Sequence, residues 1–166
     1  MTTENEPAGD YVRQIGRPFL ARRIAQLHDL LTEQGQELLD DAGIDFDARL
    51  GSVFFLIASN PRLSVAAVAE ELGLSHQLAT YRVKKLVKAG LISQVRDPED
   101  RTRSVLQPTG SARLVVQKIQ AVMHRLDQVY AQLFEELGID LLETMTRARR
   151  ALKTNSLLER SRHVQE

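Results

Sequence analysis

Apolar residues near the start of the chain recur at steps of three and four, which is the spacing of one buried face of a helix. Pro18 suits the first turn of this helix, because its fixed φ angle is already helical. The apolar positions that follow are Leu20, Ile24, Leu27 and Leu31. The pattern predicts a long first helix with an apolar stripe, and Gly35 and Gly43 bracket its expected end.

The same spacing predicts a second helix from about Asp47 to Ser59. Its expected buried side consists of Leu50, Val53, Phe54 and Ile57. The helix should stop before Asn60-Pro61, because a residue that precedes proline disfavours the helical conformation. We expect this helix to lie mostly in the core.

Two short helices are predicted next, each opened by a serine and closed by a glycine. Ser64 begins the first helix and Gly73 closes it. Ser75 begins the second helix and Gly90 closes it. The inward positions are Val65, Val68, Ala69 and Leu72 in the first and Ala79, Val83 and Leu86 in the second. Two short helices joined by a tight turn that contains glycine form a helix-turn-helix motif.

The period of the apolar residues changes after Gly90, where the helical spacing is lost. Leu91, Ile92 and Val95 lie before a polar run around residues 96–101, and Val105, Leu106 and Pro108 lie after it. Short apolar segments on either side of a polar turn predict a β-hairpin, or wing.

Two more helices are predicted in the last third of the chain. Thr109 is expected to cap the first, which would run for about 40 Å to Gly138. Its apolar positions are Val115, Ile119, Val122, Leu126, Val129, Leu133 and Leu137. The second helix starts near Asp140, and its charged end is expected to fray toward Glu166.

Composition narrows the class of protein. The 166 residues are 43% hydrophobic and 27% charged, as in an ordinary soluble globular protein. The absence of Cys excludes disulfides, thiolate catalysis and Cys-ligated zinc. The four His residues are scattered, and the sequence has no Gly-rich phosphate loop, so we expect no metal site, no cofactor and no enzyme activity. Because no signal sequence or membrane span is evident, we expect a cytoplasmic protein without a membrane partner.

Charge is unevenly distributed, although the formal net charge is zero. Acidic residues outnumber basic ones in the first 50 residues, whereas Ser75 to Arg103 contain seven Lys/Arg against three Asp/Glu. A concentration of positive charge on one segment is the electrostatic footprint of a nucleic-acid-binding surface. We therefore expect double-stranded DNA as a partner.

The helix that begins at Ser75 would present the residue types that read DNA. The candidates on or near its outer face are Ser75, His76, Gln77, Thr80, Tyr81, Lys84 and Lys85. Gln can pair with an adenine edge, and Lys neutralises phosphate charge. Further candidates are Ser64, Arg101, Thr102 and Arg103, since an arginine at a hairpin tip can enter the minor groove. Taken alone, the helix face and the turn could each be an ordinary solvated surface.

The first and last helices have more apolar surface than one small helix-turn-helix unit with its wing can cover. The candidate dimerisation residues are Leu20, Ile24, Leu27, Leu133, Leu141, Met145, Ala148 and Leu152. A second copy of the chain would bury them, and symmetric dimers suit palindromic DNA. The alternative is a monomer in which these helices wrap the head.

The predicted fold is mainly α with a small β-hairpin wing: a winged helix-turn-helix head joined to a helical dimerisation platform. Residues 1–16 would form a flexible arm, and residues 17–166 a single unit. Within that unit, residues 17–45 and 109–166 would supply the dimerisation helices and residues 46–108 the DNA-binding region.

Four runs occur in one order between residues 63 and 110. They are Leu-Ser-Val-Ala-Ala-Val-Ala-Glu-Glu-Leu-Gly-Leu-Ser (63–75), Lys-Lys-Leu-Val-Lys-Ala-Gly-Leu-Ile (84–92), Asp-Pro-Glu-Asp-Arg (97–101) and Pro-Thr-Gly (108–110). Their order and spacing resemble the MarR family of bacterial transcription regulators. The resemblance implies a homodimer with intertwined terminal helices, whose two winged heads occupy adjacent major grooves of a pseudo-palindromic operator, more often as a repressor than as an activator. It places His76, Gln77, Thr80, Tyr81 and Lys84 on the recognition helix.

The sequence departs from the family pattern at two places. The family usually has Asp, any residue and Arg in the wing, whereas here Asp100 is followed by Arg101 and Thr102, with Arg103 one place later. The family also often has Arg where Tyr81 stands.

Family members respond to small aromatic acids or drugs, or else to thiol oxidation. The second route needs a Cys, so a small-molecule effector of unknown identity is the route left open. The alternative function is a helical dimeric module that binds a ligand or a protein and has no DNA-binding activity.

Overall fold

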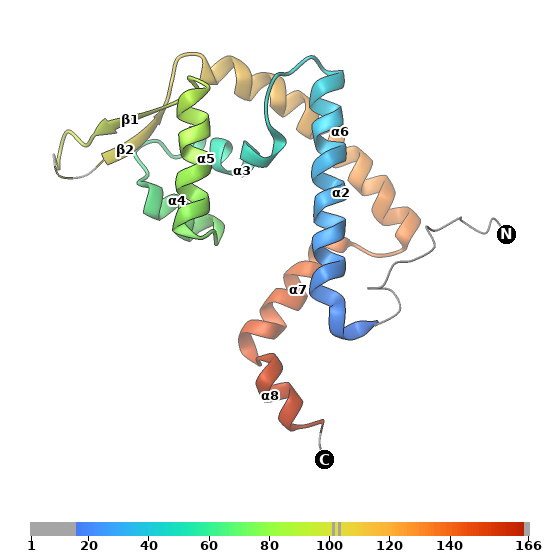
Figure 1. Ribbon diagram of the computed structural model, residues 1–166. Helices are drawn as coiled ribbons and strands as arrows, with labels where there is room; N and C mark the ends of the chain where they lie inside the picture. The colour runs from blue at the N-terminus through green and yellow to red at the C-terminus, as the bar shows by residue number, and fades with distance from the viewer. Residues whose placement is uncertain (1–15, 101, 103, 165–166) are drawn as a thin grey trace. The chain divides into compact units, whose positions relative to one another are not determined.

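The computed structural model describes residues 16–100, 102 and 104–164 (Figure 1). Its elements, in chain order, are η1 (Arg17–Phe19), α2 (Leu20–Asp41), η2 (Ala48–Leu50), α3 (Gly51–Ser59), α4 (Val65–Leu72), α5 (His76–Lys88), β1 (Ile92–Arg96), β2 (Ser104–Pro108), α6 (Ala112–Leu137), α7 (Leu141–Thr154) and α8 (Leu157–Arg162). This confirms a mainly helical fold with one β-hairpin. The chain divides into two compact units, and the boundary falls inside α6, between Val122 and Met123.

The core of the first unit forms where α3, α5 and the hairpin pack together. Phe54 and Ile57 of α3, Leu86 of α5 and Leu106 of β2 are fully buried. The four predicted inward positions of the second helix are all buried, so the expectation that this helix is mostly core is confirmed. Leu39 of α2 and the early α6 residues Ala112, Ile119 and Val122 belong to the same cluster. The core therefore extends into the helices on both sides of the helix-turn-helix.

The two short helices have the caps that the sequence predicts. Ser64 Oγ accepts a hydrogen bond from the Ala67 N–H at 3.1 Å, and Ser75 Oγ accepts one from the Leu78 N–H at 3.2 Å. Gly73 closes α4 with φ 62°, in the left-handed region where a residue without Cβ has no steric cost. These local signals fix the helix-turn-helix.

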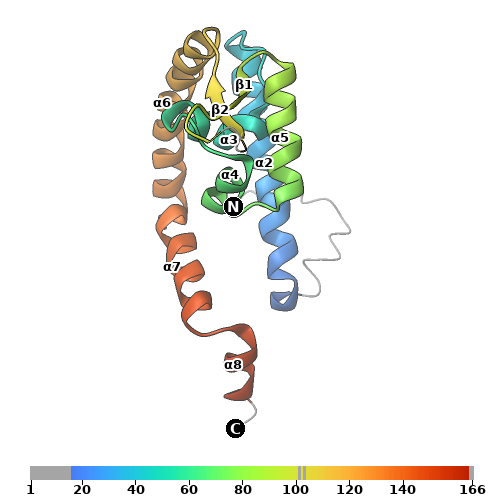
Figure 2. The same cartoon turned by 90° about the vertical axis from the view of Figure 1, so that its left-hand side faces the viewer.

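The hairpin also agrees with the prediction (Figures 1 and 2). β1 and β2 are antiparallel, with Ile92 opposite Pro108 at one end and Arg96 opposite Ser104 at the other. Leu63, in the loop before α4, forms an isolated bridge with Leu106 of β2. The wing is thus joined through its backbone to the loop between α3 and α4.

The end of the first long helix differs from the expectation in one respect. α2 continues through Gly35 to Asp41, and only Gly43, with φ 66°, marks its end. A glycine inside a helix costs about 1 kcal/mol relative to alanine, which the packing of the surrounding turns readily offsets. Here Leu38 and Leu39 pack on the core just beyond Gly35.

Thr109 does not cap α6, contrary to the sequence-based expectation. The helix begins later, at Ala112, and the Thr109 hydroxyl donates to the carbonyl oxygens of Gly90 at 2.7 Å and Leu91 at 3.1 Å. Ser111 Oγ donates to the Gly90 carbonyl as well, at 3.0 Å. Both hydroxyls therefore connect the end of the hairpin to the C-terminus of α5.

The second unit contains the end of α6 together with α7 and α8. Asp140 caps α7 by accepting the Glu143 N–H at 2.9 Å. The expected fraying after α7 is wrong, because Ser156 and Glu159 form a capping box that begins α8. Within the described part of the chain, no helix combines the length and the apolar content that a membrane span requires.

Candidate nucleic-acid interface

The outer face of α5 carries a row of polar and basic side chains. The helix buries Ala79, Val83 and Leu86 on its inner side. Because successive helical residues turn by about 100°, the opposite side consists of positions spaced four, three and four apart. These positions are Gln77, Tyr81, Lys84 and Lys88, and all four are exposed. We refer to these four residues as the outer row of α5.

Lys88 was not among the residues predicted from the sequence. It lies four residues after Lys84 and seven after Tyr81, so helical spacing alone placed it on the same face. Lys88 lies in the last turn of the helix, where positive charge also complements the helix dipole. Lys88 therefore extends the candidate interface by one turn.

Lys85 is also exposed but is engaged within the protein. Its Nζ lies 3.8 Å from Asp47 Oδ2 and 5.5 Å from the centroid of the Tyr81 ring. Asp47 caps η2 at the same time, accepting the Arg49 N–H at 3.0 Å. Lys85 thus connects α5 to the beginning of η2 and contacts the ring of Tyr81. Its charge is partly balanced before any DNA approaches.

The other predicted helix residues flank the outer row at the start of α5. His76 is exposed, and Thr80 is half-buried with its Oγ1 3.5 Å from His76 Nδ1. The hydroxyl oxygens of Ser75 and Ser64 accept the cap hydrogen bonds of α5 and α4. Each serine retains a hydroxyl hydrogen that can be donated to a phosphate oxygen.

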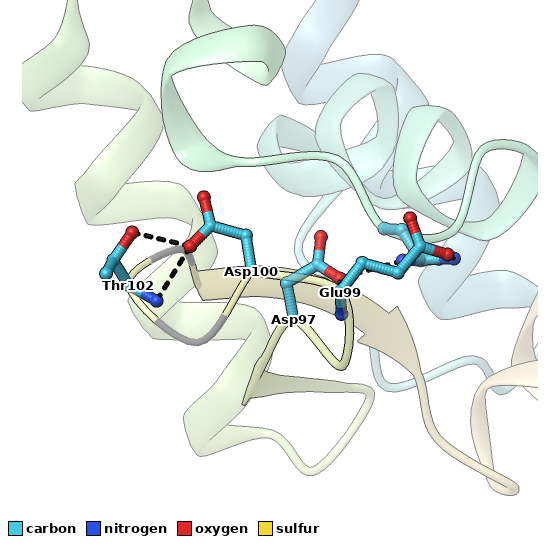
Figure 3. A network of polar contacts seen from close by, with 5 residues as sticks. Asp97, Glu99, Asp100 and Thr102 are labelled. Carbon is cyan, nitrogen blue, oxygen red and sulfur yellow. Dashed lines mark hydrogen bonds and ion pairs between the residues drawn. The ribbon is translucent and has the colours of Figure 1, made fainter.

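In the wing, the structure gives Thr102 a role in shaping the turn (Figure 3). Its N–H and its hydroxyl both donate to Asp100 Oδ1, at 2.9 Å and 2.6 Å. A phosphate is an acceptor and would have to compete with Asp100 for the hydroxyl hydrogen. The predicted wing residues Arg101 and Arg103 lie outside the described residues.

A second polar cluster at the base of the wing was not predicted. Arg62 Nη2 lies 2.7 Å from Asp97 Oδ1, and Arg62 Nη1 lies 3.3 Å from Glu99 Oε1. The hydrogen bond to Asp97 is the main cause, and that to Glu99 the second, of a pKa of Arg62 above its ordinary value. The partners are 35 and 37 residues apart in sequence, so no local pattern indicates them.

The candidate dimerisation residues are largely exposed within the single chain. The exposed fraction is 63% for Leu20, 50% for Ile24 and 57% for Met145. Leu27, Ala148 and Leu152 are exposed too, whereas Leu133 and Leu141 are half-buried. Exposed apolar side chains in this number are typical of surfaces that a partner covers.

The helix-turn-helix and the first strand of the wing match a known protein family. The family model described as the MarR family matches residues 51–101. A search of curated proteins found no match to the chain.

Solved structures extend the likeness over most of the chain. The PcaV transcriptional regulator from Streptomyces coelicolor is 26% identical, with a TM-score of 0.59, over 81% of this chain and 96% of the other. The transcriptional regulator BldR from Sulfolobus solfataricus is 20% identical, with a TM-score of 0.59, over 81% and 92%. Wild-type MarR from E. coli is 19% identical, with a TM-score of 0.55, over 81% and 96%.

These findings bear directly on the expected class of protein. The matched family and the structural neighbours are transcriptional regulators, as expected for a regulator rather than an enzyme. The sequence match covers residues 51–101, and the structural match extends over 81% of the chain. Over residues 51–101 the chain is similar to the MarR family, and its fold is that of winged helix-turn-helix transcriptional regulators such as PcaV and BldR.

Proposed function

We propose that the chain is a sequence-specific DNA-binding repressor that occupies a pseudo-palindromic operator as a homodimer. The observation that carries this proposal is the outer row of α5. It combines an amide, a phenol and two ammonium groups on the exposed side of a helix whose other side is anchored in the core.

The outer row has the chemistry that a major groove requires. An α-helix fits this groove, and the Gln77 amide offers a donor and an acceptor to an adenine edge. Tyr81 presents a ring and a hydroxyl at the next turn, and Lys84 and Lys88 provide positive charge for phosphates. Because both short helices are capped and packed, little conformational entropy remains to be lost when the row meets DNA.

The dimer is supported by the exposed apolar side chains of α2 and of the second unit. Leu20, Ile24 and Met145 are each at least half exposed. Contact of apolar surface with water is unfavourable, and a second copy of the chain would bury these side chains. A two-fold dimer presents its two recognition helices to successive major grooves, so half-site centres are expected about 10 base pairs apart. Such a dimer would repress by covering the operator.

Selection of bound sequences from a random duplex pool tests this function. The expected result is enrichment of an inverted repeat with that spacing, whose affinity falls steeply as salt increases. A variant that carries both Gln77→Ala and Tyr81→Ala should enrich no repeat, and Lys118→Ala on the exposed side of α6 is a matched surface control. If the unaltered chain enriches no sequence, the proposal is wrong, and a dimeric module without DNA binding is favoured.

We further propose that a small molecule of unknown identity releases the operator. Support comes from the PcaV regulator, which was crystallised with its natural ligand and shares 23% identity with this chain over 90% of it. Screening aromatic acids for release of the selected duplex tests this step. A complex that no compound weakens would contradict it while leaving the DNA-binding proposal intact.

A further inference from the structure

The base of the wing is connected to the loop between α3 and α4 by its backbone. The Arg62 N–H donates to the Leu106 carbonyl at 2.8 Å, and the Leu106 N–H donates to the Leu63 carbonyl at 2.9 Å. This pair of bonds fixes β2 against the helix-turn-helix. Because β1 is paired with β2 from Ile92 to Arg96, the same bonds also hold β1, and the polar turn beyond the paired residues is left to be set by side chains.

The Arg62 side chain supplies that second connection. Its guanidinium meets Asp97 directly after β1, and Glu99 two residues further into the turn. Only 9% of the Asp97 side chain is exposed, and among the described residues Asp97 is the one charged or polar residue classed as buried. The same Asp97 Oδ1 accepts the Glu99 N–H at 3.0 Å, which shapes the first bend of the turn. One carboxylate therefore both forms the turn and receives the arginine.

The backbone at Arg62 indicates that this arrangement is held in place by its surroundings. Its φ of 79° lies in the left-handed region, and it is the one non-glycine residue with positive φ in the described part of the chain. A glycine would adopt this conformation without strain but would have no side chain to reach Asp97. Strain of this kind persists where the surrounding contacts over-determine the local structure, and it often marks a functional position.

We infer that Arg62 is a positioning residue for DNA binding, which holds the wing at the correct angle to α5 without contacting DNA itself. The inference rests on the proposed function. Both terminal nitrogens of Arg62 already meet carboxylates, so a phosphate would have to displace Asp97 or Glu99 to reach them. The ion pairs also balance the positive charge of Arg62, so Arg62 should release few counterions from the DNA.

The test compares Arg62→Ala, Arg62→Lys, Asp97→Asn and the double variant Arg62→Ala/Asp97→Asn on the duplex that selection yields. Arg22→Ala is the matched control, because Arg22 is an exposed arginine of α2 on the side opposite the Leu20 stripe. Affinity is measured over a series of salt concentrations. Amide hydrogen exchange of residues 92–96 and 104–108 is measured without DNA.

A positioning role predicts a specific set of results. Arg62→Ala and Asp97→Asn should each weaken binding about tenfold, the factor expected for a charge-assisted hydrogen bond. The double variant should bind DNA as tightly as the weaker-binding of the two single variants, because each single substitution already removes the same Arg62–Asp97 contact. Arg62→Lys should recover part of the loss, and the slope of affinity against salt should not change. Exchange should accelerate in the hairpin but not in α5, and the Arg22→Ala control should behave as the unaltered chain.

Other results overturn the inference. A salt slope that becomes shallower by about one in Arg62→Ala, with Asp97→Asn binding as tightly as the unaltered chain, would mean that Arg62 contacts phosphate directly. Unchanged affinity and unchanged exchange in Arg62→Ala would mean that the cluster does not hold the wing, and the proposed function would stand. If no duplex is selected at all, the proposed function fails, and the exchange measurement alone decides whether Arg62 restrains the hairpin.

Discussion

Lys84 and Lys85 are adjacent in sequence, but the structure predicts different contributions to DNA binding. Lys84 lies on the outer row of α5, and the described residues include no ion-pair partner for it. Lys85 lies next to Asp47, with its Nζ 3.8 Å from the carboxylate. We therefore expect Lys84→Ala to remove a phosphate contact and Lys85→Ala to remove an intramolecular one.

The magnitude for Lys84 follows from counterion release. Each phosphate contact contributes about 0.9 to the slope of log affinity against log salt. At about 0.15 M salt, the loss of one contact should weaken binding about fivefold, or about 1 kcal/mol. Lys85→Ala should leave the slope unchanged and should lower the free energy of unfolding by less than about 1 kcal/mol, as is usual for an exposed ion pair.

Fluorescence polarisation with the selected duplex over a series of salt concentrations measures both quantities. Lys118→Ala, which removes one exposed lysine from α6, controls for the loss of overall positive charge and should keep the slope of the unaltered chain. If Lys84→Ala and Lys85→Ala reduced the slope of log affinity against log salt equally, the reasoning would be refuted. That result would show that Lys85 leaves Asp47 and contacts the DNA backbone.

Three further outcomes are expected. Gln77→Ala or Tyr81→Ala should cost about 1 to 3 kcal/mol on the selected operator and much less on random duplex, as competition binding would show; equal losses on both duplexes would contradict base reading. Changing Leu141 and Met145 together to Glu should convert the dimer to a monomer in sedimentation and weaken operator binding, whereas an unaltered chain that sediments as a folded monomer at micromolar concentration would contradict the dimer. Hydrogen bonds with Ser156 hold the pKa of Glu159 below its ordinary value of 4.5. The ionised Glu159 therefore stabilises α8 above pH 4.5, and this stabilisation is lost as the pH falls through the lowered pKa. Backbone chemical shifts of α8 that do not change as the pH is lowered through this range would contradict the prediction.

The sequence predicted the helix-turn-helix well because its signals are local. A serine oxygen can accept only the N–H groups that follow it within a turn, and a glycine with positive φ stops a helix at its own position. Ser64, Gly73 and Ser75 therefore marked the ends of α4 and α5 correctly. The outer row of α5 followed from the inner row by helical geometry alone, with Lys88 as its missed member.

Contacts between distant segments left no such signal. The Arg62–Asp97 pair joins a loop to the wing, and the Lys85–Asp47 pair joins α5 to η2. Each forms only after the core has brought its two segments together, so the sequence shows the residues as ordinary solvated charges. The same reason explains why the sequence predicts Thr109 as a cap: its acceptors, the Gly90 and Leu91 carbonyls, become neighbours only when the hairpin closes.

Several residues predicted to bind DNA turn out to stabilise the backbone locally. Ser64 and Ser75 cap the two helices, and Thr102 donates twice to Asp100. Short polar side chains serve both purposes because the groups that satisfy a helix end or a turn are the same groups that meet a phosphate. A loss of DNA binding on changing one of them therefore does not identify a contact, since the loss of a cap alone costs about 1 kcal/mol of stability. Gln77 and Lys84 make no cap or turn hydrogen bond among the described residues, so their substitution separates DNA contact from stability, whereas Tyr81 also contacts Lys85.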